Sequence, residues 1–282
     1  MSRVRIYSSR PALPADVLSY QNVPYIAGGH ERQELDLYLP GNRQNTPLII
    51  WIHGGGFQLG SKEDHVPFEY LSQGCAVASI GYRLSREALF PAQIEDCKAA
   101  VRWLRLNSDI FSLDPDRFGA WGESAGGNLA AMLGTSGDVN GFDVGENLDI
   151  SSRVRAVVDY FGPIDFLQMD AHLLPGSYVH NAPDSPESIL IGGPIQEMKE
   201  RVTQANPVTY VTGSTPPFLI VHGDCDRLVP HHQSELLEAA LKKAGVPVTL
   251  YTVKGAGHGG FTDPEVPAIT RAFWAAHLQP EL

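Results

Sequence analysis

The chain has 282 residues, of which 43% are hydrophobic and 19% charged, and its formal net charge is −11 at pH 7. This composition is typical of a globular protein, and the length fits a single α/β domain near the upper size of one hydrophobic core. The acidic balance disfavours nucleic acid and anionic membranes as partners, and no apolar run reaches the roughly 18 residues that a membrane span needs.

The cysteines and the first residues indicate the compartment. Cys75, Cys97 and Cys225 are odd in number and widely spaced, so neither a disulfide framework nor a zinc site is predicted. The opening sequence MSRVRIYSSRPALP lacks the apolar core and cleavage site of a signal peptide. We therefore expect a cytoplasmic protein, although a secreted protein whose leader had been removed would look the same.

Predicted strands and helices alternate along the chain. Residues 1–30 carry many Pro, Ser and Gly breaks and are expected to form an N-terminal arm. Residues 33–39 alternate leucines with polar side chains, which predicts a half-exposed strand near a sheet edge. Apolar runs predict buried strands. They are expected at residues 48–52, 76–80, 118–121, 154–161, 218–221 and 248–253.

Helices are expected between these strands, with a short one near residues 68–72. Pro91 opens a helix whose apolar side carries Ile94, Cys97, Val101 and Leu104. The polar residues are expected on its opposite face, namely Glu95, Asp96, Lys98, Arg102 and Arg105. Further helices are predicted at residues 128–133 and 234–244, and a last one is capped by Thr262 or Asp263 before Pro264, with Val266, Ile269 and Phe273 on its apolar side.

This alternation predicts an α/β fold with a mostly parallel central sheet flanked by helices, in one domain over residues 1–282. Ligands of such sheets bind beyond the carboxyl ends of the strands. Two stretches interrupt the pattern, residues 138–152 and residues 164–215. Because long connections tend to be lids or disordered, and because the second stretch keeps apolar residues, we expect residues 164–215 to form a small ordered cap before the strand at 218–221.

Residues 118–128, FGAWGESAGGN, follow the order strand, tight turn and helix that a nucleophile elbow requires. Ser124 is the candidate nucleophile. Gly122 and Gly126 flank it because a turn that lifts one hydroxyl above the sheet brings backbone too close for a Cβ. The G-x-S-x-G pattern also recurs by chance in Gly-rich chains, so the surrounding strand and helix carry this interpretation.

A second motif, His53-Gly54-Gly55-Gly56, follows a buried strand. Consecutive glycines can point N–H groups at the negative oxygen that develops when an ester carbonyl is attacked. We therefore predict an oxyanion hole made by the N–H groups of Gly55, Gly56 and Ala125. Taken alone, the motif is equally well a flexible glycine turn. His53 is expected to brace the loop.

Ser124 needs a base and an orienting carboxylate downstream of it. Of ten histidines, His258 lies on a loop after the last predicted strand and follows a suitable acid. Spacing leaves that acid open between Asp224 and Asp226. Glu123 is expected to point away from the Ser124 hydroxyl. We expect no metal and no cofactor. His231 and His232 are adjacent at a helix start, should point apart, and lack the spacing of a metal pair.

Several stretches together resemble the hormone-sensitive-lipase-like branch of the α/β-hydrolases: IHGGGFQLGSK, YRLSREALFPAQIEDCKAAVRWL, GAWGESAGGN, HGDCDRLVP and GAGHGG. Within that branch, FPAQIEDCKAAVRWLR, VVDYFGPIDF, ESILIGGPI and ANPVTYV look like the bacterial bifunctional feruloyl and acetyl xylan esterases. The resemblance implies the α/β-hydrolase fold, a cap over the site, and hydrolysis of acetyl and hydroxycinnamoyl esters of plant polysaccharides. In such proteins the acid is the second Asp of an HGxxDxxVP pattern, which implies Asp226, with Asp224 a structural neighbour.

The hypothesis from the sequence is a serine carboxylesterase in which Ser124, Asp226 and His258 hydrolyse short-chain or aromatic esters through an acyl-enzyme. The substrate would be a small ester or an acylated carbohydrate, and a homodimer is left open. A peptidase or formamidase would use the same residues on an amide. A ligand-binding receptor is disfavoured because all three residues are present. The absent signal peptide counts against a polysaccharide, which is met outside the cell.

The stretch 164–215 also bears on the acyl group. It lacks a long apolar amphipathic helix, so we expect a short acyl pocket. It carries polar residues better suited to a sugar or a phenol than to a lipid, unless they simply face solvent. These residues are Asp165, Asp170, His172, His180, Asn181 and Asp184.

Overall fold

The structure, a computed structural model, describes residues 13–278. Its centre is one eight-stranded sheet. The strands are β1 (Leu18–Pro24), β2 (Glu34–Leu39), β3 (Thr46–Ile52), β4 (Ala76–Ile80), β5 (Leu113–Glu123), β6 (Ala156–Tyr160), β7 (Phe218–Gly223) and β8 (Val248–Val253). Their order across the sheet is β1-β2-β4-β3-β5-β6-β7-β8. Strand β2 pairs antiparallel with both of its neighbours, and β4, β3, β5, β6, β7 and β8 pair parallel.

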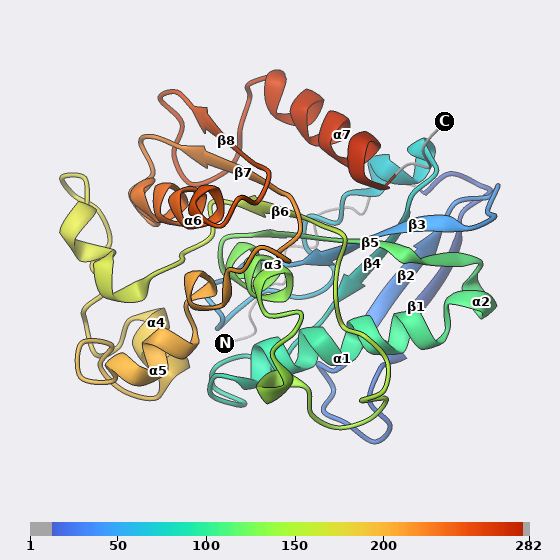
Figure 1. Cartoon of the computed structure of the whole chain (residues 1–282), viewed down its shortest axis with the longest axis horizontal. Coiled ribbons are helices and arrows are strands. Elements are labelled where there is room, and N and C mark those ends of the chain that lie inside the picture. Colours follow the sequence, from blue (N-terminus) through green and yellow to red (C-terminus); the bar gives the residue numbers. More distant parts are fainter. Residues whose placement is uncertain (1–12, 279–282) are drawn as a thin grey trace, which may run out of the picture.

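Helices cover both faces of this sheet (Figure 1). The α-helices are α1 (Ala92–Leu106), α2 (Ser108–Phe111), α3 (Ala125–Thr135), α4 (Pro186–Ile191), α5 (Lys199–Gln204), α6 (His232–Lys243) and α7 (Glu265–Leu278). The 3-10 helices are η1 (Phe68–Gln73), η2 (Asn140–Phe142), η3 (Phe166–Gln168), η4 (Asp170–His172) and η5 (Pro207–Tyr210). One apolar core lies under α1, α3 and α6, and a second lies under α7 and η1. This two-sided arrangement confirms the predicted α/β fold.

Two expectations for the first part of the chain need correction. Residues 18–24 of the predicted arm form strand β1, while residues 1–12 lie outside the described part of the chain. Because β1 covers its outer side, β2 is an interior strand and is buried almost throughout. Its polar side chain Asp36 is buried rather than exposed, and it pairs with Lys62 Nζ at 2.8 Å. The alternation of leucines and polar residues therefore identified the two faces of β2 correctly, but the polar face is buried against protein instead of facing solvent.

The polar face of α1 was predicted wrongly for three of its residues. Asp96, Lys98 and Arg102 are at most 1% exposed, although Glu95 and Arg105 remain partly exposed. Asp96 is bound by Arg83 and Gln33. Lys98 and Arg102 are covered by the connection at residues 136–152. Asp143, from that connection, accepts from Lys98 Nζ at 2.7 Å and from Arg102 Nη1 at 2.6 Å. The charges are buried because a distant segment neutralises them.

The remaining helices follow the expected pattern. Asp263 caps α7, since its Oδ1 accepts a hydrogen bond from Glu265 N at 2.9 Å. Leu237 and Leu241, on the apolar side of α6, are fully buried. On the outer side of the same helix, Glu238 pairs with Lys242 at 2.8 Å. Across residues 13–278, none of the helices has the length and apolar character that a membrane span requires.

Residues 164–215, called the cap segment below, contain η3, η4, α4, α5 and η5. The segment lies beside α6 and beyond one end of the sheet, in yellow and orange in Figure 1. It is joined to the loops after the strands. The N–H of Tyr178 donates to Arg227 O at 2.9 Å, and the first turn of α4 meets the glycine loop, since a Cβ on Gly56 would lie 3.4 Å from Pro186 Cβ.

Candidate active site

Ser124 lies on a sharp turn between β5 and α3. Its backbone has φ 54° and ψ −122°, a strained conformation for a residue with a side chain, and its N–H donates to Tyr160 O at 2.8 Å. The flanking glycines are sterically required. A Cβ on Gly122 would lie 2.0 Å from Gly126 O, and a Cβ on Gly126 would lie 2.0 Å from Ile52 O. The turn therefore has the geometry that the G-x-S-x-G spacing predicts.

Three loops at the carboxyl ends of β5, β7 and β8 bring Ser124, His258 and Asp226 together. His258 Nε2 lies 2.9 Å from Ser124 Oγ, and His258 Nδ1 lies 2.6 Å from Asp226 Oδ2. A carboxylate accepts hydrogen bonds, so the Nδ1 proton is directed at Asp226. Nε2 is then free to accept the proton of the Ser124 hydroxyl, which is the arrangement of a nucleophile and its general base.

The two candidate acids have different surroundings. The side chain of Asp226 is fully buried, and its Oδ1 accepts from Leu228 N at 2.7 Å and from Val229 N at 2.9 Å. Burial by itself would raise the pKa of Asp226, but hydrogen bonds from His222 and His258 outweigh it and hold that pKa well below its usual range. Asp224 is partly exposed and binds Gly255 N and Lys254. The geometry therefore places Asp226, and not Asp224, at His258.

The glycine loop runs past the nucleophile. A Cβ on Gly54 would lie 3.4 Å from Ser124 Cβ, and Gly55 and Gly56 have φ of 114° and 58°, which favour glycine. Among the described residues, the N–H groups of Gly55, Gly56 and Ala125 donate to no protein acceptor. Ala125 is also the first residue of α3, where the helix dipole favours negative charge. These three donors are thus available for an anionic oxygen.

His53 supports this loop. Its Nδ1 lies 2.7 Å from Gly54 O, to which it donates, and its ring stacks on Tyr82 with centroids 4.4 Å apart. Burial lowers the pKa of His53 to about 4, so the ring is neutral near pH 7. The contacts agree with the predicted bracing role.

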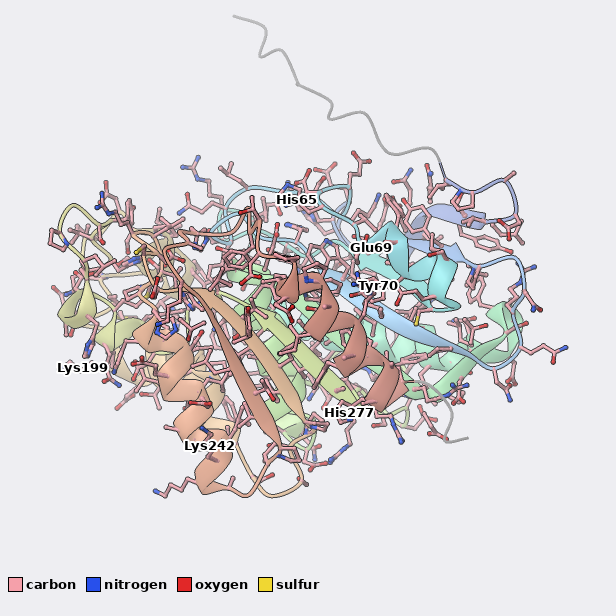
Figure 2. The ribbon with its side chains drawn as sticks, turned by 90° about the horizontal axis from the view of Figure 1, so that it is seen from above. His65, Glu69, Tyr70, Lys199, Lys242 and His277 are labelled. Atoms are coloured by element: carbon pink, nitrogen blue, oxygen red, sulfur yellow. The ribbon has the colours of Figure 1, made fainter. Side chains whose placement is uncertain are left out.

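Glu123 points away from the Ser124 hydroxyl, as predicted. Its Oε1 lies 2.6 Å from Nδ1 of His65, whose side chain is 75% exposed at the surface (Figure 2). The carboxylate next to the nucleophile is therefore engaged with a surface histidine and does not compete for His258.

Two further residues contact the site without having been singled out in the sequence. Phe161 follows β6 with φ 43°, an unusual value for a bulky residue, and its ring centroid lies 4.6 Å from that of His258. His222 lies near the end of β7, with Nε2 3.2 Å from Asp226 Oδ2. Both lie in stretches that carry the family resemblance, VVDYFGPIDF and HGDCDRLVP, but neither was given a role from the sequence.

The remaining histidines give no metal site. His231 contacts Glu235 and Thr252, whereas the His232 ring stacks on His172 with centroids 3.4 Å apart, so the two adjacent side chains diverge as predicted. Within residues 13–278, no group of three or more His, Cys, Asp or Glu side chains is placed to hold a metal ion.

Most polar side chains of the cap segment serve its own folding. Asp170 accepts from His180 N at 2.7 Å and from Asn181 N at 2.9 Å, and Asp165 caps η3 through Leu167 N. His180 is buried, with Nε2 2.7 Å from Leu228 O. The cap segment therefore offers fewer free polar groups to a sugar than its sequence indicated.

The fold and the site define a class of protein. A mostly parallel sheet with a serine on the β5–α3 turn, an aspartate after β7 and a histidine after β8 is an α/β-hydrolase arrangement. The profile of the BD-FAE family matches residues 35–241, more than half of the chain. The chain belongs to the BD-FAE family.

Three curated relatives from Mycobacterium tuberculosis are named as esterases or carboxylic ester hydrolases. The chain is 29% identical to esterase LipQ of Mycobacterium tuberculosis over 265 residues, which cover 85% of this chain and 61% of LipQ. The matched regions cover 49% of the probable carboxylic ester hydrolase LipM and 53% of esterase LipC, both from the same organism. The chain thus covers about half to three fifths of these curated relatives.

Two solved structures match over most of both chains. A truncated form of a carbohydrate esterase from gut microbiota is 34% identical, with a TM-score of 0.84, covering 92% of this chain and 95% of that one. An acetyl ester-xyloside bifunctional hydrolase from Caldicellulosiruptor lactoaceticus is 26% identical, with a TM-score of 0.72, covering 86% and 87%.

Proposed function

We propose that this protein is a serine carboxylesterase that hydrolyses short-chain or aromatic esters through an acyl-enzyme. The observation that carries the proposal is the continuous chain of contacts from Ser124 Oγ through His258 to the buried carboxylate of Asp226. The names of the similar proteins support the same reaction class.

In the first half of the reaction, His258 Nε2 takes the hydroxyl proton while Ser124 Oγ bonds to the ester carbonyl carbon. The carbonyl oxygen becomes negative and accepts hydrogen bonds from Gly55, Gly56 and Ala125 N–H. Collapse of this intermediate breaks the ester bond, and His258 returns its proton to the departing alkoxide. The alcohol leaves, and the acyl group stays on Ser124.

In the second half, water takes the place of the alcohol. His258 removes one proton from the water as its oxygen attacks the acyl carbon, and the same N–H groups stabilise the second intermediate. Ser124 Oγ then leaves with the proton from His258, and the carboxylic acid is released. Asp226 keeps its negative charge throughout and stabilises the His258 imidazolium in both halves.

For the substrate, we propose small acyl groups such as acetyl or feruloyl on an alcohol or a sugar. Support comes from the names of two similar structures, a carbohydrate esterase and an acetyl ester-xyloside bifunctional hydrolase. Pro186, at the start of α4, also lies next to Gly56 of the glycine loop. An acyl chain that had to displace α4 would lose binding energy.

The test is kcat/KM on p-nitrophenyl esters from acetyl to dodecanoyl, with feruloyl esters and acetylated xylosides as further arms. Each buried methylene adds about 0.8 kcal/mol of binding where there is room, so a wide apolar tunnel favours long chains and a short pocket reverses that order. We expect the acetyl to butyryl esters to be fastest. A maximum at octanoyl or beyond would rule out the short pocket. Matched p-nitroanilides distinguish an esterase from an amidase, and we expect little turnover of them.

A further inference from the structure

A second imidazole reaches the carboxylate that orients His258. His222 Nε2 lies 3.2 Å from Asp226 Oδ2, the same oxygen that His258 Nδ1 contacts at 2.6 Å. His222 belongs to β7 and is fully buried, whereas the side chain of His258 is 19% exposed. Asp226 Oδ2 is therefore shared by a fully buried histidine, His222, and a partly exposed one, His258.

The partners of His222 define where its proton lies. Nε2 lies 3.0 Å from Val229 O as well as 3.2 Å from Asp226 Oδ2, and since both oxygens are acceptors, Nε2 must carry the proton. Nδ1 is then an acceptor. It lies 2.7 Å from Oγ of Ser234, a fully buried residue of α6 whose hydroxyl can donate. One tautomer satisfies all three contacts.

The other groups around His222 agree with a neutral ring. The His231 ring lies 5.5 Å away and the Phe161 ring 6.4 Å away, and Asp226 is the charged group in contact. Burial lowers the pKa of His222, although the hydrogen bond to Asp226 opposes this effect. A neutral His222 leaves the negative charge of Asp226 available to His258.

The consequence is a carboxylate held by four N–H donors. Leu228 and Val229 bind Oδ1 through their backbone, and His222 and His258 bind Oδ2. Two of these donors, Val229 N–H and His222 Nε2–H, belong to buried residues. If His222 did not donate, Oδ2 would be held by His258 alone, the group that it is meant to orient.

We propose that His222 and Ser234 are positioning residues for the acid of this site. The Ser234 hydroxyl keeps the His222 proton on Nε2, and that N–H holds Asp226 Oδ2 at the place where it orients His258. The inference rests on the proposed esterase function, in which His258 is the general base.

The first experiment compares two variants of His222 by kcat and KM on p-nitrophenyl acetate. His222→Leu removes the donor at similar volume and should lower kcat by about 10- to 100-fold at unchanged KM, the scale of a lost hydrogen bond to a charged group. His222→Gln keeps an N–H near the Nε2 position and should recover most of that loss. Equal losses in both variants would mean that His222 only fills space, and the proposal would fail.

The second experiment uses Ser234→Ala, which should lower kcat by about 3- to 10-fold because the His222 tautomer is no longer held. Ser136→Ala is the matched control. Ser136 is a fully buried serine of the same size, and its Oγ donates to Met132 O at 2.6 Å in α3, so kcat should not change. If both alanine variants keep the wild-type kcat, Ser234 has no positioning role and the proposal is overturned.

The pH profile separates positioning from packing. Without the His222 donor, the Asp226 carboxylate is a stronger partner for the His258 imidazolium, so the acidic limb of kcat/KM should move to higher pH in His222→Leu and return in His222→Gln. An unmoved limb in every variant contradicts the proposal. If His222→Leu does not fold, the kcat values and pH profiles of His222→Gln and Ser234→Ala test the proposal instead.

The proposed function is tested independently by the wild-type protein. Hydrolysis of p-nitrophenyl acetate and covalent labelling of Ser124 by a fluorophosphonate would establish the esterase, whatever His222 does. If the wild-type protein is active and labelled while the His222 variants match it in kcat and pH profile, the positioning proposal alone is wrong.

Discussion

Two of the regions in which this protein buries charged side chains do so to different ends. On α1, Lys98 and Arg102 lie against Asp143 at 2.7 and 2.6 Å, and the pairs join the helix to a connection about forty residues away. At the site, Asp226 holds His258, whose far nitrogen faces the Ser124 hydroxyl. In the first region every charge has a fixed opposite charge. In the second region, the hydroxyl proton of Ser124 can move to His258 Nε2.

The comparison indicates what each region contributes. Fixed buried ion pairs tie segments together, and breaking one leaves an uncompensated charge in the core. A buried carboxylate beside a partly exposed imidazole is suited to orienting a base. We therefore expect substitutions on α1 to lower stability without lowering the activity of folded protein, and substitutions at the site to do the reverse.

The largest effect is expected for Ser124→Ala. Loss of the nucleophile should reduce kcat by about 10⁶, while the free energy of unfolding stays about the same because alanine keeps the Cβ and the strained backbone of Ser124. Steady-state kinetics on p-nitrophenyl acetate and urea denaturation measure the two quantities. A variant that retains a tenth of the wild-type rate would show that Ser124 is not the nucleophile.

Asp226→Asn should follow, with kcat lower by about 10⁴, because an amide cannot hold the His258 tautomer that accepts the Ser124 proton. Asp224→Asn is the matched control two residues away. Its side chain contacts Lys254 and Gly255 at the surface, so its kcat should stay within a few-fold of wild type. Equal losses in the two folded variants would contradict the geometry of the site.

Asp143→Ala tests the other region. It leaves Lys98 and Arg102 buried without their carboxylate, and the free energy of unfolding should fall by about 3 to 5 kcal/mol while kcat at low temperature is unchanged. Glu238→Ala is the control, because it breaks a pair with the exposed Lys242 on the surface of α6 (Figure 2) and should cost less than about 1 kcal/mol. Similar values for both variants would mean that the α1 pairs contribute no more than a surface pair.

The buried carboxyl of Asp159 sharpens the comparison because, among residues 13–278, it forms no ion pair. Burial raises the pKa of Asp159 from 3.8 to about 7, and its Oδ1 accepts from Gly162 N at 2.9 Å. The native state therefore binds a proton between about pH 4 and 7 that the unfolded state has released. Stability from this group is greatest below pH 4 and falls as the pH rises, by at most about 1.4 kcal/mol per pH unit.

The measurement is the free energy of unfolding of wild type and Asp159→Asn between pH 4 and 8. The variant has no carboxyl to titrate, so its stability relative to wild type should rise across this range and level off above pH 7. A difference that does not change with pH would mean that Asp159 has an ordinary pKa in the folded protein.

The local motifs could be predicted from the sequence. The turn at Ser124 depends on two glycines within four residues of each other, and the glycine loop on consecutive residues, so steric rules specify both. The strands at residues 48–52 and 76–80 are similarly specified by their apolar runs. The turn, the glycine loop and the two strands each depend on residues that are neighbours along the chain, and the structure confirms all of them.

Spacing left the acid open between Asp224 and Asp226, and the family resemblance implied Asp226, which the structure brings to His258. The burial of charges required the tertiary structure. Asp36, Lys98 and Arg102 look solvent-exposed in the sequence because periodicity shows which side chains share a face, and not what covers that face. Here the partners come from elsewhere in the chain, since Lys62 pairs with Asp36 and residues 136–152 lie against Lys98 and Arg102. The role of His222 could not be predicted from the sequence for the same reason. Its partners Asp226 and Ser234 contact it only when β7, the following loop and α6 are packed together.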